Sequence, residues 1–160
     1  MTSLHIETEV LAPRERCFDL ARSVDLHTDS ALIIAGKATA HRIAGLSDLG
    51  DKTTWSARFF GVRFNLTTAI TQFDRPNRFS DIMYEGLFNH FGHVYTFEAR
   101  GEDRTFVTDA FSFESPFDVL GTAFDSFILR RRMQAVASFR ALYIKRIAES
   151  DAWRKYLPNV

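Results

Sequence analysis

A small set of polar residues lies on predicted strands and could move a proton or polarise a carbonyl group. His93 and Tyr95 stand two positions apart, and Asp109 falls in the following strand pattern. Residues two apart share one face of a strand, so the histidine and the tyrosine point the same way. A histidine or a carboxylate can transfer a proton, and a tyrosine can polarise a carbonyl. These three residues are the candidates for acid–base catalysis.

A purely structural role for the same residues stays open, because each could occupy a wet face or pair with a neighbour. A buried charge without a partner is costly, so an inward Asp109 needs a hydrogen-bond donor. His93 and Tyr95 are the suitable donors. In their strand pattern the charge of Glu98 favours solvent, and alternation then places Phe97 inside with the histidine and the tyrosine.

Other catalytic and metal-binding patterns are missing from the sequence. It has no nucleophile elbow, no dinucleotide-binding glycine loop and no Walker-type phosphate loop. The single cysteine, Cys17, precedes Phe18 on a predicted helix face and is expected in the core. His90 and His93 are three positions apart, which directs their side chains to opposite faces of a strand. We therefore expect no metal site and no cofactor.

The composition limits the partners of the protein. Basic and acidic residues number 20 each, so the chain offers no general electrostatic footprint for nucleic acid. No run approaches the roughly 18 apolar residues of a membrane-spanning helix, and the opening segment lacks a secretory signal pattern. A lone cysteine fits a reducing compartment. We expect a cytoplasmic protein, and the sequence leaves its oligomeric state open.

Seven predicted strands position these residues. Period-two alternation, broken by turns rich in glycine, asparagine, aspartate and proline, indicates the strands. They span 4–11, 37–44, 53–59, 62–73, 78–84, 91–100 and 104–114. Short gaps between them favour antiparallel neighbours. The fifth and seventh strands carry apolar residues on both faces, so their inward face stays open.

Helical signals flank the strands. Pro13 suits the first turn of a short helix, and a second short helix is expected over 25–34. Apolar residues then follow helical spacing from Phe117 to Glu149. The expected apolar face of this long helix consists of Ile128, Leu129, Met133, Ala135, Val136, Phe139, Leu142, Tyr143 and Ile147. We assign one domain over 1–150 and a tail over 151–160 that folds back or frays.

The chain resembles the START-like superfamily, also called SRPBCC, over nearly its whole length. The segment 4–20 (LHIETEVLAPRERCFDL) is similar to the opening of that group, and 55–63, 68–79 and 93–98 continue the similarity. The resemblance implies an α+β helix-grip fold, in which a seven-stranded curved antiparallel sheet surrounds a long C-terminal helix and two short helices follow strand one. It also implies a cavity for apolar ligands between sheet and helix. Members include polyketide cyclases, coenzyme-Q-binding proteins and carriers.

We expect the cavity to bind a small hydrophobic or amphipathic ligand, such as a lipid, a quinone or a polyketide-like molecule. The 16 phenylalanines favour an aromatic lining. The predicted ligand-binding residues are Trp55, Phe59, Phe64, Leu66, His93, Tyr95, Phe97, Asp109, Phe111, Phe124 and Met133. Two alternatives stay open. One is a cyclase or dehydratase acting on a polyketide-like substrate, and the other is a protein-interaction module that uses the outer sheet face or the loop with Phe88 and Phe91.

Overall fold

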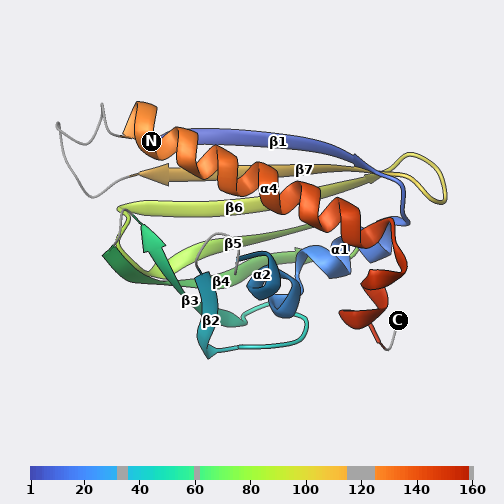
Figure 1. Ribbon diagram of the computed structural model, residues 1–160, viewed down its shortest axis with the longest axis horizontal. Coiled ribbons are helices and arrows are strands. Elements are labelled where there is room, and N and C mark those ends of the chain that lie inside the picture. Colours follow the sequence, from blue (N-terminus) through green and yellow to red (C-terminus); the bar gives the residue numbers. More distant parts are fainter. Residues whose placement is uncertain (32–35, 60–61, 115–124, 159–160) are drawn as a thin grey trace.

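The computed structural model describes residues 1–31, 36–59, 62–114 and 125–158 (Figure 1). One antiparallel sheet has the strand order β1-β7-β6-β5-β4-β3-β2. The strands are β1 (Thr2–Val10), β2 (Gly36–His41), β3 (Lys52–Phe59), β4 (Val62–Asp74), β5 (Arg78–Glu85), β6 (His90–Ala99) and β7 (Thr105–Glu114). The helices are α1 (Arg14–Ala21), α2 (Val24–Ala31), the π-helical turn η1 (Asp125–Leu129), α4 (Arg130–Ala148) and the 3-10 turn η2 (Asp151–Lys155). The predicted helix-grip order of strands and helices is confirmed.

The helices cover one face of the sheet. In Figure 1, α4 crosses β1, β7 and β6 diagonally, and α1 and α2 lie beside it. α4 contacts β1 and α1, and α1 contacts β6. Among the helices that the structure describes, none combines the length and the apolar character needed to cross a bilayer. Side chains that point from the sheet toward this helical layer therefore form the interior.

The sequence left open which face of β5 and which face of β7 points inward. The exposure of their side chains shows the inward face of each strand. In β5, Phe79 is 3% exposed, whereas Ile82 and Tyr84 on the other face are 47% and 66% exposed. In β7, Asp109 and Phe111 are buried. The inward face of β7 therefore carries a carboxylate among aromatic rings.

Strand register brings the polar candidates together. Asp81 on β5 pairs with His93 on β6, and Tyr95 on β6 pairs with Asp109 on β7. Directly opposed residues on antiparallel strands have side chains about 5 Å apart at the Cβ atoms. The register alone thus assembles acid, imidazole and phenol on one inner wall.

The buried face of α4 agrees only in part with the face that the sequence predicts. Ile147 is buried as expected. Leu142 is 62% exposed and Ala135 is exposed, while Ala137, Ala141 and Ile144 are buried. Small side chains let a helix backbone approach its neighbours closely, which explains why alanines rather than leucine face β1 and α1. The expected start of this helix at 117 lies outside the described residues.

Phe18 on α1 occupies the centre of the main core. Its ring packs against Phe73, Phe79 and Phe97 at centroid separations of 5.4, 5.4 and 5.3 Å. Cys17 beside it is fully buried, as the sequence predicts. Burial raises the pKa of the Cys17 thiol to about 11. The thiol is therefore protonated at neutral pH and is not a nucleophile.

A buried carboxylate ties α1 to the turn between β4 and β5. Asp19 is 1% exposed, and it accepts hydrogen bonds from Arg22 Nε at 2.8 Å and from Arg75 Nη2 at 2.6 Å. Burial opposes its charge, but the hydrogen bonds and charges of both guanidinium groups outweigh burial and hold the pKa of Asp19 below its ordinary value. This ion-pair network fixes α1 against one end of the sheet.

The C-terminal segment folds back onto α2. Lys155 donates a hydrogen bond to Asp29 at 2.6 Å, and the Tyr156 hydroxyl donates to the same carboxylate at 2.8 Å. Tyr156 and Leu157 are buried. The sequence left open whether the tail folds back or frays. As far as residue 158, the tail folds back onto the body of the protein.

Replacing Asp19 with asparagine should lower the free energy of unfolding by about 3 kcal/mol, because two guanidinium groups lose a buried charged acceptor. Urea denaturation measures this loss. The control is Glu98→Gln, which removes an ion pair with Arg100 whose two side chains are both 56% exposed. The control should cost less than about 1 kcal/mol. Equal losses in the two variants would contradict the role assigned to Asp19.

Candidate functional site

A cavity of about 200 Å³ lies between the sheet and the helices. β3, β4 and β7 contribute Trp55, Phe64 and Phe111 to its wall. α4 contributes Met133 and Val136 from the opposite side. The wall is largely apolar, with a few polar groups that converge on it, and this composition is typical of a small-molecule site.

His93 is held between the carboxylates of the two neighbouring strands. Its Nε2 atom is hydrogen-bonded to Asp109 on β7, and its Nδ1 atom lies 3.5 Å from Asp81 Oδ2 on β5. Its ring stacks on Phe111 with centroids 3.9 Å apart and planes 15° apart. Because both ring nitrogens face carboxylates, the histidine directs its protons toward protein atoms and presents its ring to the cavity.

His93 is a cation at neutral pH. Burial disfavours the charged imidazolium, but the charge and hydrogen bond of Asp109, reinforced by Asp81, raise the pKa of His93 to about 9. Asp81 lines the cavity, whereas Asp109 lies behind the imidazole. Asp81 is therefore the member of this group that can exchange a proton with a bound molecule.

Tyr95 adds a buried phenol beside the imidazole. Its ring lies 4.4 Å from that of His93 between centroids, and the side chain is 2% exposed. Its hydroxyl finds no acceptor for its proton among the residues that the structure describes. Burial, followed by the charge of Asp109, holds the pKa of Tyr95 well above its ordinary value, so the group stays a neutral phenol. Such a hydroxyl can donate a hydrogen bond to a guest.

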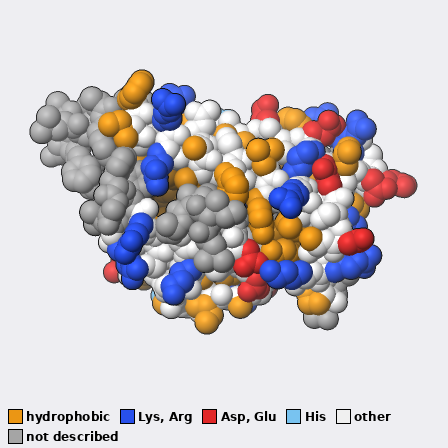
Figure 2. All heavy atoms as spheres, in the orientation of Figure 1, with side chains coloured by type: hydrophobic (Ala, Val, Ile, Leu, Met, Phe, Trp, Pro, Cys, Tyr) orange, Lys and Arg blue, Asp and Glu red, His pale blue; other side chains and the backbone are white. Residues whose placement is uncertain are grey.

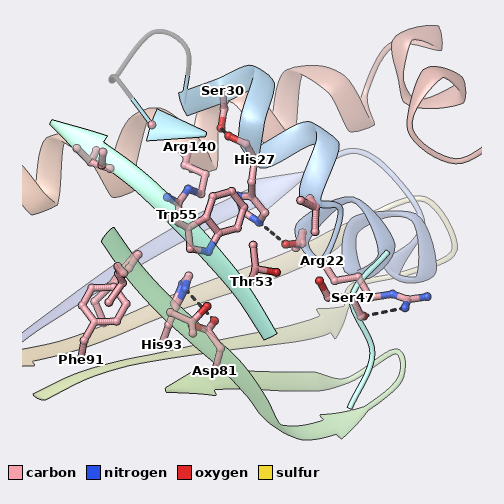
Figure 3. A pocket seen from close by; sticks show the side chains of 18 of the residues that line it. Arg22, His27, Ser30, Ser47, Thr53, Trp55, Asp81, Phe91, His93 and Arg140 are labelled. Atoms are coloured by element: carbon pink, nitrogen blue, oxygen red, sulfur yellow. Dashed lines mark hydrogen bonds and ion pairs between the residues drawn. The ribbon is translucent and has the colours of Figure 1, made fainter. Parts of the chain in front are cut away.

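The side of the cavity that α2 and α4 form carries two polar residues that were not predicted from the sequence. Arg140 on α4 and His27 on α2 line the cavity, and Figure 3 shows them beside Trp55, with His93 below. The Nε2 atom of His27 donates to the carbonyl oxygen of Ala21 at 2.6 Å. Burial, and then the charge of Arg140, lowers the pKa of His27 to about 3, so this ring is neutral.

Comparisons with known proteins identify the fold of the chain. No protein-family model matches the sequence, and no curated protein matches it. Among solved structures, TTHA0849 from Thermus thermophilus has a TM-score of 0.73 at 16% identity, over 91% of this chain and 95% of that chain. A START superfamily protein from Mycobacterium smegmatis has a TM-score of 0.65 at 12% identity, over 92% and 97% of the two chains.

The protein has the START-like helix-grip fold. Another structure of this fold is norcoclaurine synthase from Thalictrum flavum in complex with dopamine and hydroxybenzaldehyde. It has a TM-score of 0.58 at 13% identity, over 88% of this chain and 85% of that chain. Identities this low establish the fold alone. The chemistry of this START-like cavity must be argued from its own residues.

Many of the predicted ligand-binding residues lie at the cavity of this START-like chain. Those that line it are Trp55, Phe64, Leu66, His93, Tyr95, Phe111 and Met133. Phe97 is not among the lining residues, because it lies farther along β6, where α1 covers the strand and Phe18 packs on its ring. Asp109 is also behind the wall. Phe124 and the side chain of Phe59 lie outside the described residues.

Arg140 could have been found from helical spacing. It follows Met133 by seven residues, and residues seven apart lie on the same face of a helix. A single arginine on an otherwise apolar helix face indicates a polar group that points into the interior. Asp81 is one of the polar residues on predicted strands that could face inward, but the sequence left its direction open, because both faces of its strand carry apolar residues.

The free energy of unfolding should fall as the pH rises through about 9. The pKa of His93 in the folded protein, about 9, exceeds the value of 6.5 expected for an unfolded histidine. Its stabilising contribution is therefore complete below pH of about 6.5 and is lost as the imidazolium deprotonates. Urea denaturation at several pH values measures the loss.

The histidine is tested by comparing two variants across the same pH range. His93→Gln cannot carry the proton, so it should lack the part of the loss that belongs to this group. His90→Gln removes a hydrogen bond to Ser112 at 2.9 Å, and this variant should still show the full loss of stability at high pH. A wild-type protein and a His93→Gln variant with parallel stability profiles would show that the buried imidazolium is absent.

Proposed function

We propose that the protein binds a small hydrophobic or amphipathic molecule in the cavity between the sheet and α4. The observation that carries this proposal is an aromatic-lined space of about 200 Å³ between the sheet and the helices. Burial of apolar ligand surface there would contribute roughly 25 cal/mol per Å², less the cost of immobilising the guest. A role as a docking module for another protein has less support, because that role predicts an interior filled by the protein's own side chains.

The size of the cavity restricts the guest. Sites for drug-sized ligands span about 300–1,000 Å³, and a dry cavity of about 150 Å³ holds benzene. A space of about 200 Å³ therefore suits a compact molecule, or the ring of a larger quinone or polyketide-like compound. A whole membrane lipid would require the walls to move.

Native mass spectrometry of freshly purified protein, followed by organic extraction, should reveal a bound apolar compound. Val136→Trp should abolish this binding, since the larger side chain would fill the cavity that Val136 lines. Ala135→Trp is the matched control, because Ala135 is the preceding residue of α4 and is exposed. No bound mass, together with no thermal shift from a panel of quinones and aromatic compounds, would contradict the proposal.

A second candidate function is proton-transfer catalysis, favoured by the contact between Asp81 and the buried His93 cation. In a dehydration, Asp81 would take a proton from the carbon beside a carbonyl that accepts a hydrogen bond from Tyr95. The same proton would then leave with the departing hydroxyl group as water. His93 would hold Asp81 in position through the contact between its Nδ1 atom and Asp81 Oδ2, and it would not itself exchange a proton with the substrate.

The extracted compound separates an enzyme from a carrier. If the protein is a dehydratase, Asp81→Asn should retain an unreacted compound that is heavier by one water molecule than the compound bound to the wild type. If it is a carrier, both proteins should yield the same compound. Thr68→Ser, at another cavity-lining position, is the control and should behave as the wild type in either case. Identical compounds from all three proteins would exclude dehydration.

A further inference from the structure

Arg140 is a cation in the cavity wall for which the described residues supply no ionic partner. No carboxylate within those ranges forms an ion pair with it, although it is only partly exposed. Arg22, which also lines the cavity, provides the contrast. Its guanidinium contacts Asp19 at 2.8 Å and Asp48 at 2.7 Å. Arginine side chains in partly buried positions usually have such partners, so the guanidinium of Arg140 is available to a guest.

Tyr95 supplies a second donor near the same place. Its buried hydroxyl has no acceptor in the part of the chain that the structure describes. The positive charge of Arg140, and then a hydrogen bond from its guanidinium, oppose the rise in the pKa of Tyr95 that burial causes. A phenol and a guanidinium can both donate hydrogen bonds, and the guanidinium accepts none. The missing group is therefore an acceptor, and a negative charge on it would balance the arginine.

The charges around the cavity agree with an anionic guest. Arg58 lines the cavity at its exposed edge, and Arg132 lines it from α4. Among the charged side chains on the left part of the helical face, Figure 2 shows mainly Lys and Arg, and Figure 1 places the start of α4 there. A basic rim raises the local concentration of small anions. On the opposite wall, the charges of Asp81 and Asp109 are partly compensated by His93, so the helical wall is the place for the negative end of a guest.

We propose that the natural guest is a carboxylic acid with one ring, whose carboxylate lies between the guanidinium of Arg140 and the hydroxyl of Tyr95. This inference rests on the proposed binding function. A planar carboxylate matches the fork of a guanidinium and has a further lone pair for the phenol. The remaining space, about 200 Å³ in all, takes one ring and a short chain against Phe64, Leu66 and Met133.

The inference is tested with two probes of almost the same shape, phenylpropanoate and phenylpropanol. Isothermal titration should give at least about tenfold tighter binding of the acid to the wild-type protein, which corresponds to one charge-assisted hydrogen-bond pair. Arg140→Gln should remove this preference while the alcohol still binds. Tyr95→Phe should reduce the preference by a few-fold. Circular dichroism and thermal unfolding confirm that each variant is folded.

Arg146→Gln is the matched control, because Arg146 lies on α4 and is exposed. It should keep the preference of the wild type. Equal affinity for acid and alcohol in the wild type, or an acid preference that survives in Arg140→Gln, would overturn the carboxylate assignment and leave the proposed binding function standing. Tighter binding of palmitate than of phenylpropanoate would overturn the single-ring assignment. Failure of every probe, with no co-purifying compound, would overturn the binding function as well.

Discussion

The imidazolium of His93 lies between the carboxylates of Asp81 and Asp109, and the inner wall of the cavity depends on this charged contact. Each of the three residues comes from a different strand, so the contact forms only when β5, β6 and β7 are in register. A slipped register would leave buried charges without partners, at a cost of several kcal/mol. The same contact occupies both ring nitrogens. On this wall it therefore leaves Asp81 and Tyr95 as polar groups that face the cavity.

The long helix packs closely over one part of its length and lines a cavity over another. Ala137, Ala141 and Ala148 are buried, and these small residues bring the helix against β1 and α1. Met133 and Val136 face the cavity instead. A rigid helix laid across a curved sheet cannot contact it equally everywhere, so tight packing at one end is compatible with a space at the other. The ion pairs of Asp19 hold α1 in the position from which it supports this arrangement.

The two proposed functions, binding and catalysis, would use the same cavity, and the fold does not decide between them. The helix-grip fold includes norcoclaurine synthase from Thalictrum flavum as well as a START superfamily protein from Mycobacterium smegmatis, both below 25% identity to this chain. Function within a shared fold lies in particular side chains. In this protein the proposed functions rest on a buried histidine cation on the sheet and, on the helix, on an arginine that has no ion-pair partner among the described residues. The first supports proton transfer at Asp81, and the second supports recognition of an acid.

The sequence by itself determined the order of strands and helices, and it placed His93, Tyr95 and Phe97 on one inward face. Alternation with a charged residue such as Glu98 leaves only one face of a strand fit for burial. The sequence could not orient β5 or β7, because apolar residues lie on both of their faces, and it located the buried stripe of α4 only in part. Only the tertiary structure opposed Asp81 to His93 and turned Arg140 into the cavity. Those contacts depend on strand register and on the neighbours that a helix meets, which no local periodicity encodes.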